Sequence, residues 1–287
     1  MAEGKKYPLP TRAQLEAYIE QEGRTAGSLI AGFMLSTETV PWLEEAAERH
    51  PDDPRVSAMM LMVARGLKQP TDEWVRRMQE NDPKNSLGWC NAALDAFKAG
   101  DVESGLDALE GAASRGRPHM YPQEISSEVT KACKSAGFDS LYAETLGMAH
   151  LPIGQISVLM ELAQHMKTGP AEAKGPAIES LLALTQSLKK PTERAGLVEK
   201  LISSSIERTI VNSSEWYEEM PGLDMTAAEL QERNSTERAA TSALIKEHRR
   251  LLPTLSDTEM KQYLRRIAVE GEFNAMQWVV QTKGGNQ

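Results

Sequence analysis

The fold of this chain is indicated most clearly by residues 85–118, which read NSLGWCNAALDAFKAGDVESGLDALEGAASRGRP. The stretch contains two amphipathic segments, with Trp89 in the first turn and Gly100–Asp101 at the junction between them. Small residues such as Ala93 and Ala112 fall where the two helices must touch, which lets their axes approach closely. The pattern predicts a helical hairpin that buries its apolar face by stacking on further hairpins.

The same register extends toward the N-terminus. Pro51, Pro83 and Pro118 recur at nearly equal intervals, and each follows a pair of amphipathic segments. Between Pro51 and Pro83 the first predicted helix ends at Gly66, and a second helix follows it. A capping box at Thr11 predicts a further helix near the start of the chain.

The 85–118 unit resembles a tetratricopeptide repeat. The matching positions are the early aromatic Trp89, the small residues Ala93 and Ala112, the turn Gly100–Asp101, and Pro118, one residue beyond the family's closing proline. The chain departs from the family at Ala96, where a second aromatic is expected, and at Gly105, where the family has Ala. The resemblance covers about residues 28–118 and implies a short, degenerate array of stacked hairpins.

The rest of the chain lacks this register but keeps helical periodicity. Capping boxes at Thr226 and Ser256 predict two further helices, the second carrying apolar residues from Met260 to Val280, whereas KTGPAEAKGP (167–176) is typical of a loop. No sustained alternation of apolar and polar residues predicts a strand. We therefore expect an all-α protein. Its predicted parts are a tail (1–10), a repeat-like helical domain (11–150) and a C-terminal domain (151–287) that is either a helical bundle or a divergent continuation of the stack.

Composition excludes several classes of function. The formal net charge of −9 argues against an extended nucleic-acid surface. Basic pairs such as Lys189–Lys190 are expected to be solvated or to offset the dipole at a helix end. The sequence predicts no membrane span and no signal peptide, so the cytoplasm is the default location, although a trimmed exported protein would look the same. Two cysteines are too few for a disulfide framework. A single disulfide between them would still be compatible with an oxidising compartment.

No motif in the sequence points to catalysis. The histidines lack metal-ligand spacing, the cysteines lack a catalytic signature, and phosphate-binding loops are absent. We therefore expect no catalytic residue, no metal and no cofactor. The enzyme alternative requires acids or histidines brought together from distant helices of the C-terminal domain.

Two surfaces are candidates for binding a protein or peptide. If the resemblance holds, the first helix of the 85–118 hairpin lines a groove, and the matching residues are Leu87, Cys90, Asn91, Leu94, Phe97 and Lys98. Packing of Leu94 and Phe97 against the next hairpin explains the pattern equally well. The second candidate is the pair Trp216 and Tyr217, aromatic residues in a polar segment that serve either as partner anchors or as a plug for the helical bundle.

These observations favour a non-catalytic interaction or scaffold module that binds a peptide or a partner helix. The alternative is a structural subunit that uses its apolar faces for self-association or for assembly into a complex.

Overall fold

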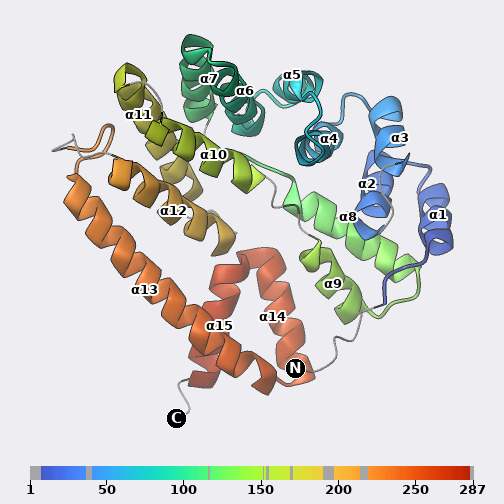
Figure 1. The fold of residues 1–287 in the computed structure, drawn as a ribbon. Coiled ribbons are helices and arrows are strands. Elements are labelled where there is room, and N and C mark those ends of the chain that lie inside the picture. The colour runs from blue at the N-terminus through green and yellow to red at the C-terminus, as the bar shows by residue number, and fades with distance from the viewer. Residues whose placement is uncertain are drawn as a thin grey trace. The chain divides into compact units, whose positions relative to one another are not determined.

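The computed structural model describes residues 8–36, 41–115, 117–150, 152, 155–168, 171–189, 197–213 and 219–284 (Figure 1). These residues form fifteen α-helices and one short 3-10 helix, and contain no strand, so the all-α prediction is confirmed. None of the described helices combines the length and the apolar character needed to cross a bilayer.

The chain divides into two compact units, and each unit contains two separate segments. The first unit consists of Met1–Asn81 and Met120–Ile153, and the second of Asp82–His119 and Gly154–Gln287. This division differs from the predicted domains 11–150 and 151–287, because the 82–119 segment packs with the C-terminal helices. The fold therefore places the 85–118 hairpin in the second unit.

The first unit is organised around a helix that is buried along nearly its whole length. This helix, α2, packs on α1, α3, α4 and α8. It can approach α1 and α3 closely because Gly32 leaves room for the side chains of Ile19 and Trp42. The helices of the unit are α1 (Arg12–Gln21), α2 (Ala26–Leu35), α3 (Pro41–Arg49), α4 (Pro54–Gly66), α5 (Asp72–Asn81), α8 (Pro122–Ser135) and α9 (Ser140–Ala149).

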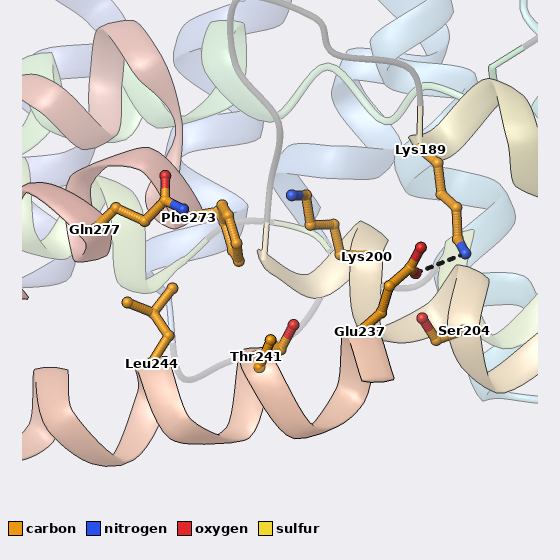
Figure 2. Close-up of a pocket in the computed structure, with 9 residues that line it drawn as sticks. Lys189, Lys200, Ser204, Glu237, Thr241, Leu244, Phe273 and Gln277 are labelled. Carbon is orange, nitrogen blue, oxygen red and sulfur yellow. Dashed lines mark hydrogen bonds and ion pairs between the residues drawn. The ribbon is translucent and has the colours of Figure 1, made fainter. Parts of the chain in front are cut away.

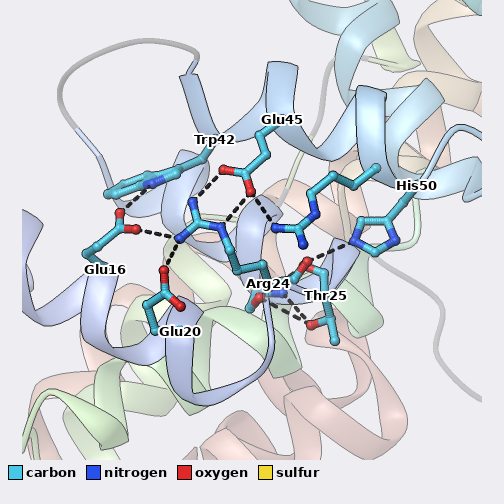
Figure 3. Close-up of polar contacts among 9 residues, drawn as sticks. Glu16, Glu20, Arg24, Thr25, Trp42, Glu45 and His50 are labelled. Atoms are coloured by element: carbon cyan, nitrogen blue, oxygen red, sulfur yellow. Dashed lines mark hydrogen bonds and ion pairs between the residues drawn. The ribbon is translucent and has the colours of Figure 1, made fainter.

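Arg24, in the turn after α1, connects this helix to α3 (Figure 3). Its guanidinium donates to both carboxylate oxygens of Glu45, with Nε 2.5 Å from Oε1, and binds Glu16 and Glu20 at 2.6 Å. The Trp42 indole donates to the other oxygen of Glu16 at 2.9 Å. The cluster thus satisfies the polar groups where α1, the turn and α3 meet.

The second unit begins with the predicted hairpin and continues through the C-terminal helices. The hairpin α6/α7 packs on a second hairpin, α10/α11, with α6 against α10 and α7 against α11. Helix α12 packs on both helices of the second hairpin, and α13 packs on α12 and α15. The elements are α6 (Ser86–Ala99), α7 (Val102–Arg115), α10 (Gln155–Thr168), α11 (Ala171–Lys189), α12 (Leu197–Ser213), α13 (Ala227–Leu251), η1 (Leu252–Thr254), α14 (Asp257–Glu270) and α15 (Glu272–Gly284).

The contact between α6 and α7 involves Gly105, one of the positions that depart from the repeat pattern. Phe97 lies against Gly105, where a Cβ atom would come within 2.6 Å of its ring, and Trp89 lies against Gly111. Arg115 also covers the Trp89 ring, with its guanidinium carbon 3.8 Å from the ring centroid. Glycines on α7 therefore make room for the large aromatic side chains of α6.

Two predicted boundaries are wrong. The 167–176 segment was expected to be a loop, but α11 begins at Ala171 and runs through Pro176. Pro176 is the sixth residue of that helix, so its missing N–H removes one hydrogen bond near the helix start while the remainder packs on three other helices. The residues from Met260 to Val280 were expected in one helix, but Gly271, at φ 85°, separates α14 from α15.

Candidate functional site

The predicted groove on α6 consists mostly of buried side chains. Leu87, Cys90, Asn91 and Leu94 are at most 2% exposed. The Asn91 amide donates to the carbonyl of Leu87 in its own helix at 2.8 Å, and burial raises the pKa of the Cys90 thiol to about 12. A partner could reach these four side chains only if α6 separated from its neighbours.

The other two predicted groove residues lie near the C-terminal end of α6. Phe97 is half-buried against Gly105, and Lys98 is exposed. The Lys98 ammonium forms an ion pair with Glu161 of α10 at 2.6 Å, which connects the two stacked hairpins. Trp216 and Tyr217, the second predicted surface, lie outside the described residues.

A cavity of about 350 Å³ lies among α11, α12, α13 and α15 of the second unit (Figure 2). Its volume is near the lower end of the range for small-molecule sites, roughly 300–1,000 Å³. The lining combines ammonium, carboxylate, hydroxyl and amide groups with an apolar wall. The lining residues are Lys189, Lys200, Ser204, Glu237, Ala240, Thr241, Leu244, Phe273 and Gln277.

A buried carboxylate organises one side of this cavity. Glu207 of α12 is fully buried, and its two oxygens accept from Lys189 at 2.7 Å, from Arg233 at 3.2 Å and from the Gln186 amide at 3.1 Å. The Lys189 ammonium also lies 2.9 Å from the Glu237 carboxylate. Because both cations neutralise a charge that water cannot reach, the network fixes α11, α12 and α13 against one another.

Lys189 was expected to be solvated or to offset a helix dipole. It is the last residue of α11, where a cation does favour the dipole, but its side chain is only 15% exposed. The solvated alternative is wrong for Lys189, since its ammonium is held between Glu207 and Glu237. Lys190 lies outside the described residues.

Lys200 differs from Lys189 because it has no carboxylate partner among the described residues. Its ammonium lies 3.5 Å from the centroid of the Phe273 ring, a cation–π contact across the cavity (Figure 2). Burial lowers the pKa of Lys200; the nearby Lys189 adds to this effect and Glu237 opposes it. The cavity therefore contains a partly desolvated cation that is stabilised by an aromatic ring.

Three further polar groups line the cavity without a hydrogen bond to the described part of the chain. They are the hydroxyls of Ser204 and Thr241 and the side-chain amide of Gln277. Thr241 is only 9% exposed, and its hydroxyl points into the cavity in Figure 2. Gln277 is exposed and Ser204 is half-buried, and because these groups make no hydrogen bond with the described protein atoms, they are available to a molecule in the cavity.

Two carboxylates from separate helices meet beside this cavity. Glu207 and Glu237 do come together from distant parts of the sequence, as the enzyme alternative requires, but both are ion-paired with Lys189 and Arg233. Within the described ranges, no three histidine, cysteine, aspartate or glutamate side chains converge to hold a metal ion. The arrangement supplies a cation, hydroxyl donors and an apolar wall.

The sequence by itself does not reveal this cavity. Lys200 and Ser204 are four residues apart on α12, and Glu237, Thr241 and Leu244 follow the same helical spacing on α13. Such spacing places residues on one face of a helix but does not reveal which helix that face will meet. Comparisons of the chain with protein-family models, with curated proteins and with solved structures found no match.

Proposed function

We propose that the protein is a non-catalytic helical scaffold that binds a protein or peptide partner on stacked tetratricopeptide-like hairpins. The observation that carries this proposal is the pairing of α6 with α10 and of α7 with α11. In helical-repeat proteins, successive hairpins stack with equivalent helices side by side, which produces an extended surface for partners. The free, buried cysteines Cys90 and Cys133 suit a reducing compartment such as the cytoplasm.

The surface offered to a partner is the shared edge of α6 and α10. Because the N-terminal part of α6 is buried, we assign recognition to Phe97 and Lys98 near its C-terminal end, together with Glu161 and Gln164 of α10. Lys98 and Glu161 lie side by side in an ion pair, and Gln164 is exposed three residues further along the same helix. This α6–α10 edge presents mixed polar groups, and Phe97, the neighbour of Lys98 in sequence, is half-buried with its ring against Gly105 of α7.

The proposal is tested by site-specific photo-crosslinking in cells that make the protein. A benzophenone amino acid at Gln164 is expected to give a discrete protein adduct, whereas the same group at Glu110, exposed on α7, is not. Lys98→Glu is expected to reduce the adduct. The double variant Lys98→Glu/Glu161→Lys restores the ion pair with reversed charges and controls for folding. Equal adducts at both positions, or adducts unaffected by both variants, would contradict the proposal.

Self-association is a second candidate because of two exposed apolar side chains on α12. Val198 and Leu201 are 36% and 41% exposed and lie three residues apart on one helix face. If they form a self-contact, Leu201→Glu will shift sedimentation velocity toward a smaller species. Leu67→Glu is the matched control, since Leu67 is 59% exposed in the first unit. A monomeric parent protein over a wide concentration range would exclude this candidate.

A further inference from the structure

The cavity of the second unit has one positive charge more than its internal ion pairs require. Lys189 and Arg233 provide two cations for the two carboxylates of Glu207 and Glu237, so that network is neutral. Lys200 adds a further cation, which contacts the Phe273 ring and no carboxylate of the described residues. The cavity is therefore locally positive in a chain whose formal net charge is −9.

The cavity also has more hydrogen-bond donors than the described protein atoms satisfy. The hydroxyls of Ser204 and Thr241 face the same space as Lys200. Behind the lining, Asn234 Nδ2 and Arg233 Nε are buried without a hydrogen-bond acceptor, and Arg233 Nε is 3.9 Å from the nearest Glu237 oxygen. Among the described residues, the hydroxyls of Ser204 and Thr241 and one cation without a carboxylate partner favour a ligand that brings acceptors and a single negative charge.

The apolar wall of the cavity indicates the chemistry of the rest of the ligand. Leu244 and Ala240 of α13 and the Phe273 ring of α15 give an apolar surface beside the polar groups. A volume of about 350 Å³ admits a compact molecule rather than a folded segment of another protein. A phosphate dianion fits less well, since it would bring two negative charges to Lys200, the one lining cation without a carboxylate partner among the described residues, and would lie near the Glu237 carboxylate.

We infer that this cavity binds a small organic monocarboxylate, with the ligand's carboxylate on the Lys200 ammonium and its apolar part against Leu244 and Phe273. The hydroxyl of Thr241 donates a second hydrogen bond to the carboxylate. This inference concerns α11–α15 and does not depend on the α6–α10 edge or on a protein partner. The ion-paired network of Glu207 keeps the helices that carry these groups in place.

The test is a methyl NMR titration of the full chain with benzoate, hexanoate and propionate, each matched with its neutral amide. The methyl groups of Leu244 and Ala240 line the cavity and report binding there, and that of Ala163, buried in α10, is the remote control. At least one acid is expected to shift the two cavity signals with a dissociation constant on the order of 1 mM, and its amide is expected to bind at least about tenfold more weakly.

Four variants locate the carboxylate. Lys200→Met removes the charge but keeps the length of the side chain, and is expected to weaken binding about tenfold or more, whereas Lys200→Arg retains most of it. Thr241→Val removes one donor at nearly constant volume and is expected to weaken binding about threefold to tenfold. Lys246→Met makes the same charge change at an exposed position of α13 outside the cavity, and should have no effect.

Three outcomes would overturn the inference. The first is the absence of cavity shifts with all three acids at concentrations well above the expected dissociation constant. The second is equal binding of acids and amides, or binding that Lys200→Met leaves unchanged while its spectrum stays folded. The third is preferential binding of butylamine in a manner that depends on Glu237, which would make the cavity a cation site.

Discussion

Gly147 of α9 lies where that helix passes close to α8, and its missing side chain is what allows the contact. A Cβ atom at this position would lie 2.7 Å from the backbone oxygen of Ser126 and would also collide with the Thr130 hydroxyl. The backbone of α8 cannot move aside as a flexible side chain can. The close contact therefore depends on glycine at this position.

Gly147→Ala is expected to destabilise the protein by about 2 kcal/mol, because the collision outweighs the helix propensity that Ala gains over Gly, about 1 kcal/mol. Gly66→Ala is the matched control, since a Cβ at Gly66 meets nothing within 4 Å at the end of α4. That control is expected to be neutral or slightly stabilising. Urea unfolding followed by circular dichroism measures both, and equal effects of the two substitutions would refute the close-contact explanation.

The helix caps, another feature at the scale of single residues, could be predicted from the sequence. The capping boxes at Thr11, Thr226 and Ser256 are all present, with the third helical residue returning a hydrogen bond to the cap in each case. These contacts join residues three positions apart, so the local sequence is sufficient to specify them.

At the scale of helices, the Arg24 cluster connects α1 to α3 through charge. The Arg24 guanidinium holds the pKa of Glu45 at about 2, well below its ordinary 4.5, and the second cation Arg49 contributes to the shift. A depressed folded-state pKa means that the ion pair stabilises the folded protein fully above about pH 4.5 and loses this contribution as the pH falls through about 2.

Glu45→Gln is therefore expected to lower the free energy of unfolding by about 1 kcal/mol at pH 7, with the deficit shrinking as the pH falls toward 2. Urea denaturation at pH 7, 4 and 2.5 would measure the difference from the parent protein. Glu80→Gln is the control, because Glu80 pairs with Arg76 on an exposed helix face, where ion pairs contribute little. A Glu45→Gln deficit that does not depend on pH would contradict this account.

At the scale of the whole molecule, the chain leaves the first unit and returns to it. Hairpin α6/α7 lies in sequence between segments of the first unit, but it belongs to the second unit with α10 and α11. Hydrogen exchange can test this assignment, because a cooperative unit loses protection together when one of its contacts is weakened.

Glu207→Ala removes the buried carboxylate opposite Lys189 and Arg233, at a cost of about 3 kcal/mol. Exchange measured by mass spectrometry is expected to accelerate in α6 and α7 as well as in α10 to α13, and to remain unchanged in α1, α2 and α8. Gly147→Ala should give the opposite pattern, with faster exchange in α8 and α9. Protection of α6 and α7 that followed the first unit in both variants would contradict the division.

The sequence alone was sufficient for the all-helical class, for most helix boundaries and for the 85–118 hairpin. Periodicity, caps and turn glycines act within a few residues of one another, and the hydrophobic pattern shows which face of each helix must be buried. Tertiary structure decided which buried face meets which. It placed α6 between α7 and α10, with Leu87 and Leu94 in the core, and it brought Lys189, Glu207 and Arg233 together from three helices. The cavity beside Lys200 arose in the same way, because the hydrophobic effect is not directional and leaves the choice of partner to the packing of the whole unit.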